Sequence, residues 1–158
     1  MSETARIADQ LRRAFDGNAW HGDSLFEILE GVTAAQGTAR PVPSAHSIWE
    51  LVLHIAAWDD AVRRRMTGVA VSLSAEENFP RVPNTNADTS AAAWKKTLAD
   101  ARRVHEELID AVKNFPEASL NLQVPGKTGA YYDFYYMLHG VVQHELYHAG
   151  QIALLKKM

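Results

Sequence analysis

The stretch HELYHAGQ, residues 144–151, lies near the C-terminal end of the chain, and the rest of the fold is organised around it. Two histidines four residues apart on a helix project from one face, with Cβ atoms about 5–6 Å apart, so both imidazoles can reach one divalent cation. His144 and His148 have this spacing. Gln151 projects from the same side, where it either orients a ligand from outside the coordination sphere or lies at the helix edge in solvent.

The same letters match the H-E-x-x-H signature of zinc proteases, in which the glutamate polarises a metal-bound water. Such a protease normally takes its third ligand from downstream of the motif. The ten residues after His148 contain no His, Asp, Glu or Cys. We therefore expect the third ligand to come from upstream. Glu145 is then either a general base or a structural acceptor for a neighbouring helix.

A third histidine is expected on a different helix. Residues 47–67 have helical periodicity, and His54 borders their apolar stripe. Facing helices of a bundle assemble metal sites in its core. We predict that His54, His144 and His148 bind one divalent metal, and the alternative is that they cap the core edge through hydrogen bonds. Three imidazoles suit Zn²⁺, Ni²⁺ or Fe²⁺ and do not choose between them.

The other four histidines have weaker signals. His105 lies within an apolar helical stripe, where we expect a core histidine satisfied by a hydrogen bond and not a fourth ligand. His139 points away from the pair, and His21 and His46 are expected in loops. None of these three has a partner that indicates a site.

Composition narrows the class of protein. The chain has 158 residues, 47% of them hydrophobic, which predicts one domain over residues 1–158 with a substantial core. A net charge of −3 lacks the basic excess of nucleic-acid-binding proteins, and the cluster Arg63-Arg64-Arg65 is expected to be a solvated helix face. No apolar run approaches the ~20 residues of a membrane span, and no signal peptide is evident, so we expect a cytoplasmic protein. The absence of cysteine leaves His, carboxylate or water as metal ligands.

Apolar residues at helical spacing predict an all-α four-helix bundle. Long helices are expected over residues 2–16, 47–67, 88 or 89 to 115, and 132–157, and shorter ones after the capping boxes Ser24–Glu27 and Thr33–Gln36. Long connections precede the second and third long helices and permit crossovers. The polar stretch 69–88 is expected to be a loop, and it or the Trp20-His21 loop is expected to form part of a pocket wall.

At these residues the chain resembles the DinB/YfiT-like superfamily. The matching pieces are residues 19–22 with 29–31, the stretch 47–59 containing LHIAAW, and residues 144–152. The resemblance implies a four-helix bundle with crossover connections, a Zn²⁺ or Ni²⁺ site formed by His54, His144 and His148, and a homodimer. Relatives often carry a basic residue or a second histidine after the last ligand, where this chain has Ala149.

The resemblance also implies an enzyme. Some relatives are transferases or isomerases that use a low-molecular-weight thiol, and others are named hydrolases. We expect a metal-dependent transferase that acts with such a thiol on a small-molecule substrate, with Glu145 and Gln151 as candidate catalytic residues. A metal-dependent hydrolase is one alternative. A non-catalytic metal-binding stress protein is the other, and neither a nucleic acid nor a membrane is expected as a partner.

Overall fold

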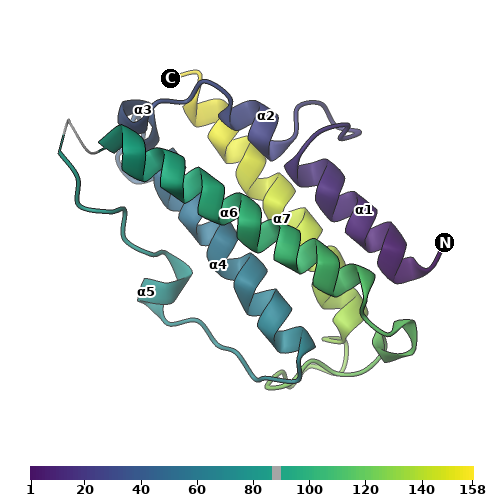
Figure 1. The fold of residues 1–158 in the computed structure, drawn as a ribbon. Coiled ribbons are helices and arrows are strands. Elements are labelled where there is room, and N and C mark those ends of the chain that lie inside the picture. Colours follow the sequence, from purple (N-terminus) through teal and green to yellow (C-terminus); the bar gives the residue numbers. More distant parts are fainter. Residues whose placement is uncertain (87–89) are drawn as a thin grey trace.

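The computed structural model describes residues 1–86 and 90–158, and it is an all-α bundle as predicted (Figure 1). Its four long helices are α1 (Glu3–Phe15), α4 (Ile48–Met66), α6 (Ser90–Lys113) and α7 (Phe134–Leu155). Shorter elements connect them: α2 (Leu25–Leu29), α3 (Ala34–Thr38), α5 (Ala75–Asn78) and the 3-10 turn η1 (Glu117–Ser119). Within the described ranges there is no strand, only an isolated bridge between Gln123 and Asp133.

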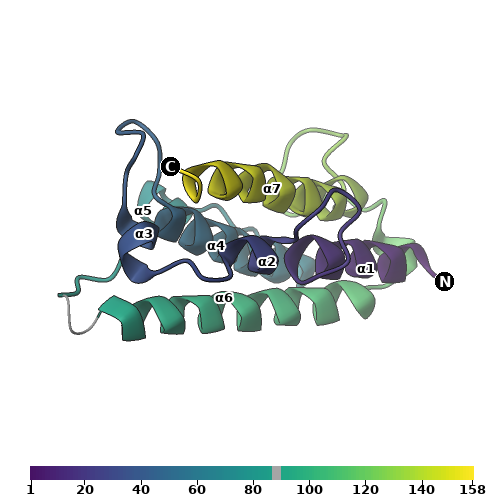
Figure 2. The ribbon, with the colours of Figure 1, turned by 90° about the horizontal axis from the view of Figure 1, so that it is seen from above.

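The bundle has the crossovers that the long connections permit. Helix α4 packs against α6 and α7, and α1 packs against the same two helices, so α1 and α4 lie diagonally opposite. In both views α4 and α6 run in one direction, while α1 and α7 run in the other (Figures 1 and 2). The order is therefore up, down, down, up, and the chain after α4 must return along the length of the bundle before α6 begins.

Helix-capping interactions explain where most of the helices begin and end. Ser47 and Glu50 form a capping box at the start of α4, and Gly68, with φ of 88°, follows its end. Boxes at Ser24 and Thr33 open α2 and α3. The start expected for the third long helix, near residue 88 or 89, lies outside the described residues.

One prediction in this region was wrong. The stretch 69–88 was expected to be a loop throughout, but Ser74 and Glu77 form a fourth capping box that opens the one-turn helix α5. Its first turn gains the same reciprocal hydrogen bonds as the longer helices, since Ser74 accepts from the Glu77 N–H and Glu77 accepts from the Ser74 N–H. The consequence is that Asn78 is held at a fixed place beside α4.

The core consists of two apolar clusters with a buried polar layer between them. One cluster gathers around Trp49 and Trp94, and the other around Leu11 and Leu108. The intervening positions of the long helices are Asp59, His105 and Glu145, each at most 1% exposed. Burying such groups is costly unless they are paired, so this layer requires its own account. None of the described helices is long and apolar enough to cross a membrane.

Candidate metal centre

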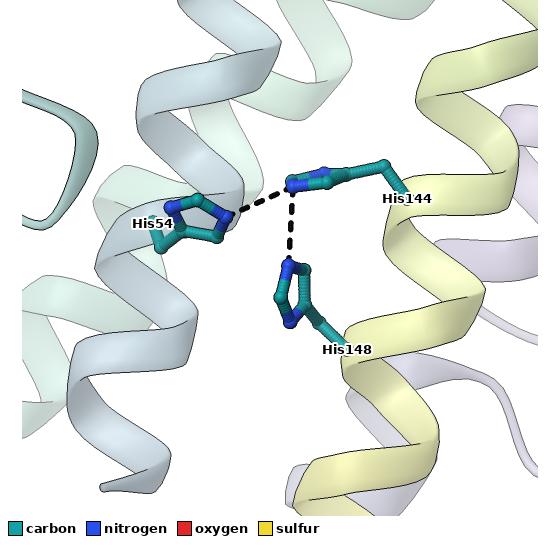
Figure 3. Close-up of side chains that lie close together, drawn as sticks. All are labelled: His54, His144 and His148. Carbon is teal, nitrogen blue, oxygen red and sulfur yellow. Dashed lines mark hydrogen bonds between the residues drawn. The ribbon is translucent and has the colours of Figure 1, made fainter. Parts of the chain in front are cut away.

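The three predicted histidines converge on one point (Figure 3). His54 comes from α4, and His144 and His148 come from successive turns of α7. The Nε2 atom of His144 lies 2.9 Å from Nε2 of His54 and 3.1 Å from Nε2 of His148. The antiparallel contact of α4 with α7 thus adds the third imidazole to the pair that the i, i+4 spacing supplies.

Two of the rings are fixed by hydrogen bonds at the other nitrogen. The Nδ1–H of His54 donates to the carbonyl oxygen of Asn78 at 2.6 Å, and the Nδ1–H of His148 donates to Oε1 of Gln151 at 2.6 Å. In the neutral rings this leaves an unprotonated Nε2, a lone pair, on both residues. Nδ1 of His144 is buried and has no hydrogen-bond partner among the described residues.

The environment keeps all three rings neutral at pH 7. Burial, aided by the nearby His148 and His46 and opposed by the Asn78 hydrogen bond, lowers the pKa of His54 to about 4. Burial and then the neighbouring His148 and His54 lower the pKa of His144 to about 3. Burial lowers the pKa of His148 as well. Neutral imidazole is the form that binds a metal.

This donor set fits a divalent metal. A proton on Nε2 of His144 can form a hydrogen bond to only one of the two neighbouring Nε2 atoms. At the other contact two nitrogen lone pairs then face each other. A cation would accept a lone pair from each of the three nitrogens. Ligands at about 2.0–2.1 Å in tetrahedral geometry lie about 3.4 Å apart. The observed separations of 2.9 and 3.1 Å need only a slight widening to reach this value. Among the described residues, these three histidines form one of two groups that could hold a metal ion.

Helix α5 and the loop before α4 hold the His54 ring in place. Phe79 stacks on His54 with ring centroids 4.1 Å apart, and His46 stacks on Phe79 at 3.8 Å. The indole N–H of Trp58 donates to Oδ1 of Asn78 at 2.8 Å. Sequence reasoning missed these contacts, although the Ser74-to-Glu77 box was a visible signal for the helix that places Asn78.

The three histidines lie at a cleft of about 1090 Å³ between α4, α7 and the chain that leads into α7. All five tyrosines of the chain line this cleft: Tyr131, Tyr132, Tyr135, Tyr136 and Tyr147. Asn78 also lines it, as expected for the 69–88 connection, whereas Trp20 is fully exposed and is not part of the lining. The cluster of tyrosine letters at 131–136 was the unused sequence signal for this wall.

The candidate catalytic residues Glu145 and Gln151 are in different places. Gln151 contacts the ring of His148, whereas Glu145 is fully buried, and its Oε1 lies 2.9 Å from Nδ1 of His105. The same Nδ1 donates to Oδ2 of Asp59 at 2.9 Å, and Phe15 stacks on the ring at 3.7 Å. His105 is thus the hydrogen-bonded core histidine that its position in the stripe indicates.

Asp59, His105 and Glu145 in the buried layer shift one another's pKa values. His105 is held as an imidazolium, because the carboxylates beside it outweigh burial and raise its pKa to about 10. Burial, together with the negative charge of Asp59, raises the pKa of Glu145 to about 8, and burial also raises the pKa of Asp59. Each of these pKa shifts depends on the ionisation of the other two groups, so the three side chains titrate as one coupled unit. Asp59, His105 and Glu145 are the second group that could hold a metal ion, and Oδ1 of Asp59 and both carboxyl oxygens of Glu145 are buried without a hydrogen-bond partner.

The arginine cluster differs from expectation. Arg63 and Arg64 are paired with Asp60 on the outside of α4, but Arg65 is only 1% exposed. Its Nε and Nη2 both donate to the carbonyl of Val71, at 3.1 and 2.9 Å. The prediction of a solvated face fails at this position because the chain after Gly68 turns back over the end of α4 and covers the side chain.

An up-down-down-up bundle with three inward-facing histidines beside an open cleft defines a class: helical proteins with a candidate metal centre between two helices. The chain belongs to the DinB superfamily, whose family model matches residues 19–152. Neither the comparison with curated proteins nor that with solved structures gave a significant match. The match spans the three histidines, α5 and most of α7.

Proposed function

We propose that this protein is a metal-dependent transferase that acts with a low-molecular-weight thiol on a small-molecule substrate. The observation that carries the proposal is the convergence of three neutral imidazole nitrogens at an open cleft whose described lining holds a single carboxylate, that of Asp133. In this proposal His54, His144 and His148 hold a single Zn²⁺ or Ni²⁺ ion. When bound, such an ion lowers the pKa of a coordinated thiol or water.

The scarcity of carboxylates in the cleft, which His139 also lines, favours a thiol over water. Asp133 is the one acidic side chain among the described residues that line the cleft, and its Oδ1 accepts the N–H of Tyr136 as the N-cap of α7. Glu145, the base of the protease motif, is buried on another face. A free thiol has a pKa of about 8.5, so a small reduction by a bound metal gives a thiolate at neutral pH, whereas the pKa of water must fall from about 15.7 to about 7. The chain has no cysteine, so the thiol must be a separate molecule.

The chain's own residues would position the reactants. Trp58 and the tyrosine side chains give the cleft apolar and aromatic walls that exclude water from part of a bound substrate. The Asn78 carbonyl and Gln151 hold the imidazoles of His54 and His148 in one tautomer, so no proton has to leave Nε2 of these two rings when a metal binds.

The test is thiol binding by cobalt-substituted protein prepared without an affinity tag. Glutathione should change the visible spectrum in a saturable way, and the change should be lost in His144→Ala but kept in the control His21→Ala, a change at an exposed residue outside the cleft. If glutathione has no effect while a bound water titrates near neutral pH, the hydrolase alternative replaces the transferase. If no added ligand reaches the cobalt, both enzyme proposals fail and a non-catalytic metal-binding protein remains.

A further inference from the structure

Arg65 lies in the wall of the same cleft, at the end away from the histidines. His54, Trp58, Val62 and Arg65 follow one another along the cleft-facing side of α4. Eleven residues separate the first and last of these, which corresponds to about 16 Å along the helix axis. The cleft therefore has a histidine end and an arginine end.

The guanidinium at this end lacks a counter-charge. An arginine side chain is always protonated in proteins. Arg65 donates two hydrogen bonds to the Val71 carbonyl, but its Nη1 is buried and has no hydrogen-bond partner. Within the described part of the chain, no carboxylate lies within ion-pair distance of it, whereas its neighbours Arg63 and Arg64 both pair with Asp60. The Trp58 ring, 5.3 Å from the guanidinium carbon, offsets the charge only in part.

The loop that carries a second cation, Lys127, packs against the chain segment that covers Arg65. Burial, and then the positive charge of Arg65, lower the pKa of Lys127. No ion pair involves Lys127 in the described structure, and its Nζ lies 5.2 Å from the centre of the Tyr132 ring. Gly126, with φ of 77°, brings the loop that carries Lys127 against the chain at Ala70, where an added Cβ would lie 3.0 Å from the alanine Cβ. Two positive groups are thus held together by the fold without an acidic partner.

We propose that Arg65 and Lys127 form a subsite for an anionic group, a carboxylate or a phosphate, of the molecule that occupies the cleft. The anion would accept hydrogen bonds from Nη1 of Arg65, which has no partner now, and from the ammonium group of Lys127. The assignment of this anionic group to the substrate or the thiol rests on the proposed function. It implies that the bound molecule is elongated. The reacting atom lies at the histidines, and the charge lies several bonds away, past the aromatic wall.

The anion subsite is tested first in metal-free protein, so that failure of the metal centre cannot affect the result. The probe is sodium phosphate added at constant ionic strength, and the readout is the Nε–H resonance of Arg65 in ¹⁵N-labelled protein, assigned with Arg65→Gln. A saturable shift is expected. In Lys127→Gln, a change in a surface loop, the dissociation constant should rise about tenfold or more, whereas Arg64→Gln should match the unchanged protein. No saturable shift, or equal binding by Lys127→Gln, overturns the subsite.

The link to the substrate is tested in cobalt-loaded protein. Mercaptoundecanoate, which is long enough to reach from one end of the cleft to the other, is compared with the mercaptoalcohol of the same length, and the cobalt spectrum reports binding. The carboxylate should bind at least tenfold tighter, and Lys127→Gln should remove this advantage. If both thiols bind equally, the proposed function survives and the role of the subsite is refuted. If phosphate binds to metal-free protein but no thiol reaches the cobalt, the subsite stands and the proposed function fails.

Discussion

His144 and Glu145 are adjacent in the chain, but their side chains belong to separate clusters. Nε2 of His144 lies 2.9 Å from Nε2 of His54, whereas Oε1 of Glu145 lies 2.9 Å from Nδ1 of His105. The ~100° turn between successive residues of a helix separates them. The H-E-x-x-H letters thus supply a pair of metal-ligand candidates on one face of α7 and a core residue on another.

Replacing His54 by alanine should remove the metal. The variant lacks one of three ligands, so its metal content should fall as severely as in His144→Ala or His148→Ala. Elemental analysis of untagged protein gives the measurement, and His21→Ala, a change in an exposed loop, serves as the control. A full equivalent of metal in His54→Ala would show that the ligand set is wrong.

Replacing Gln151 by leucine should lower the affinity for the metal without abolishing binding. Gln151 accepts the Nδ1–H of His148, and loss of such a partner typically costs 10–100-fold in metal affinity. Affinity is measured by competition with a chelator. Gln143→Leu makes the same change at an exposed position of α7 and should keep the original affinity. Equal affinities for the two variants would contradict a role for Gln151 in orienting the ring.

Replacing Glu145 by alanine should destabilise the fold and leave the metal in place. Removing one member of a buried polar pair costs about 3–5 kcal/mol, measured by urea denaturation. Glu145→Gln keeps the shape of the protonated carboxyl and should cost far less. Loss of metal from a fully stable Glu145→Gln protein would contradict the structural role assigned to this residue.

In the absence of metal, the protein should lose stability in acid through the three candidate ligand histidines. The folded protein protonates His144 only near pH 3, because burial lowers its pKa, whereas the unfolded chain takes up that proton near 6.5. Unfolding therefore binds a proton between these values, and stability falls as pH falls. The free energy of unfolding of the unchanged protein, minus that of His144→Gln, should decrease from pH 7.5 to pH 5 in the presence of chelator. If the difference in the free energy of unfolding does not change with pH, the lowered pKa of His144 is refuted.

The homodimer implied by the family resemblance stays a prediction. One side of the C-terminal half of α7, together with the residues that follow the helix, carries three apolar side chains that are each more than 60% exposed: Tyr147, Leu154 and Met158. This apolar surface is a candidate for coverage by a second copy. Light scattering at micromolar concentration should report about twice the 17.5 kDa of one chain. A species with the mass of one chain would contradict the prediction. If the dimer forms through this surface, Leu154→Glu should dissociate it.

Local signals were sufficient for the long helices and for the convergence of the three histidines, but α5 was missed. Capping boxes and glycines marked most helix ends because they satisfy backbone groups within a few residues. His54 was found because its position at the border of a buried stripe indicates the face that meets another helix. The Asp59 contact of His105 was not foreseen, since nothing local tells which helix of a bundle lies opposite.

The arginine end of the cleft was missed for a related reason. Three successive arginines indicate a solvated face, and that prediction holds for Arg63 and Arg64. The burial of Arg65 depends on the path of the chain after Gly68, which packs Val71 against the guanidinium. Such a path is set by contacts between distant residues and leaves no periodicity in the sequence.

The hydrogen bonds of Asn78 have a thermodynamic consequence. One residue of a connecting segment accepts from both the imidazole of His54 and the indole of Trp58. An interaction that fixes that imidazole therefore also favours the observed position of α5, and displacing α5 would free the imidazole. Because coupling free energies are reciprocal, an ion at the histidines would stabilise this position of α5 by the same factor by which the position strengthens ion binding. The segment between α4 and α6 is therefore energetically a part of the centre, although it contributes none of the three nitrogens.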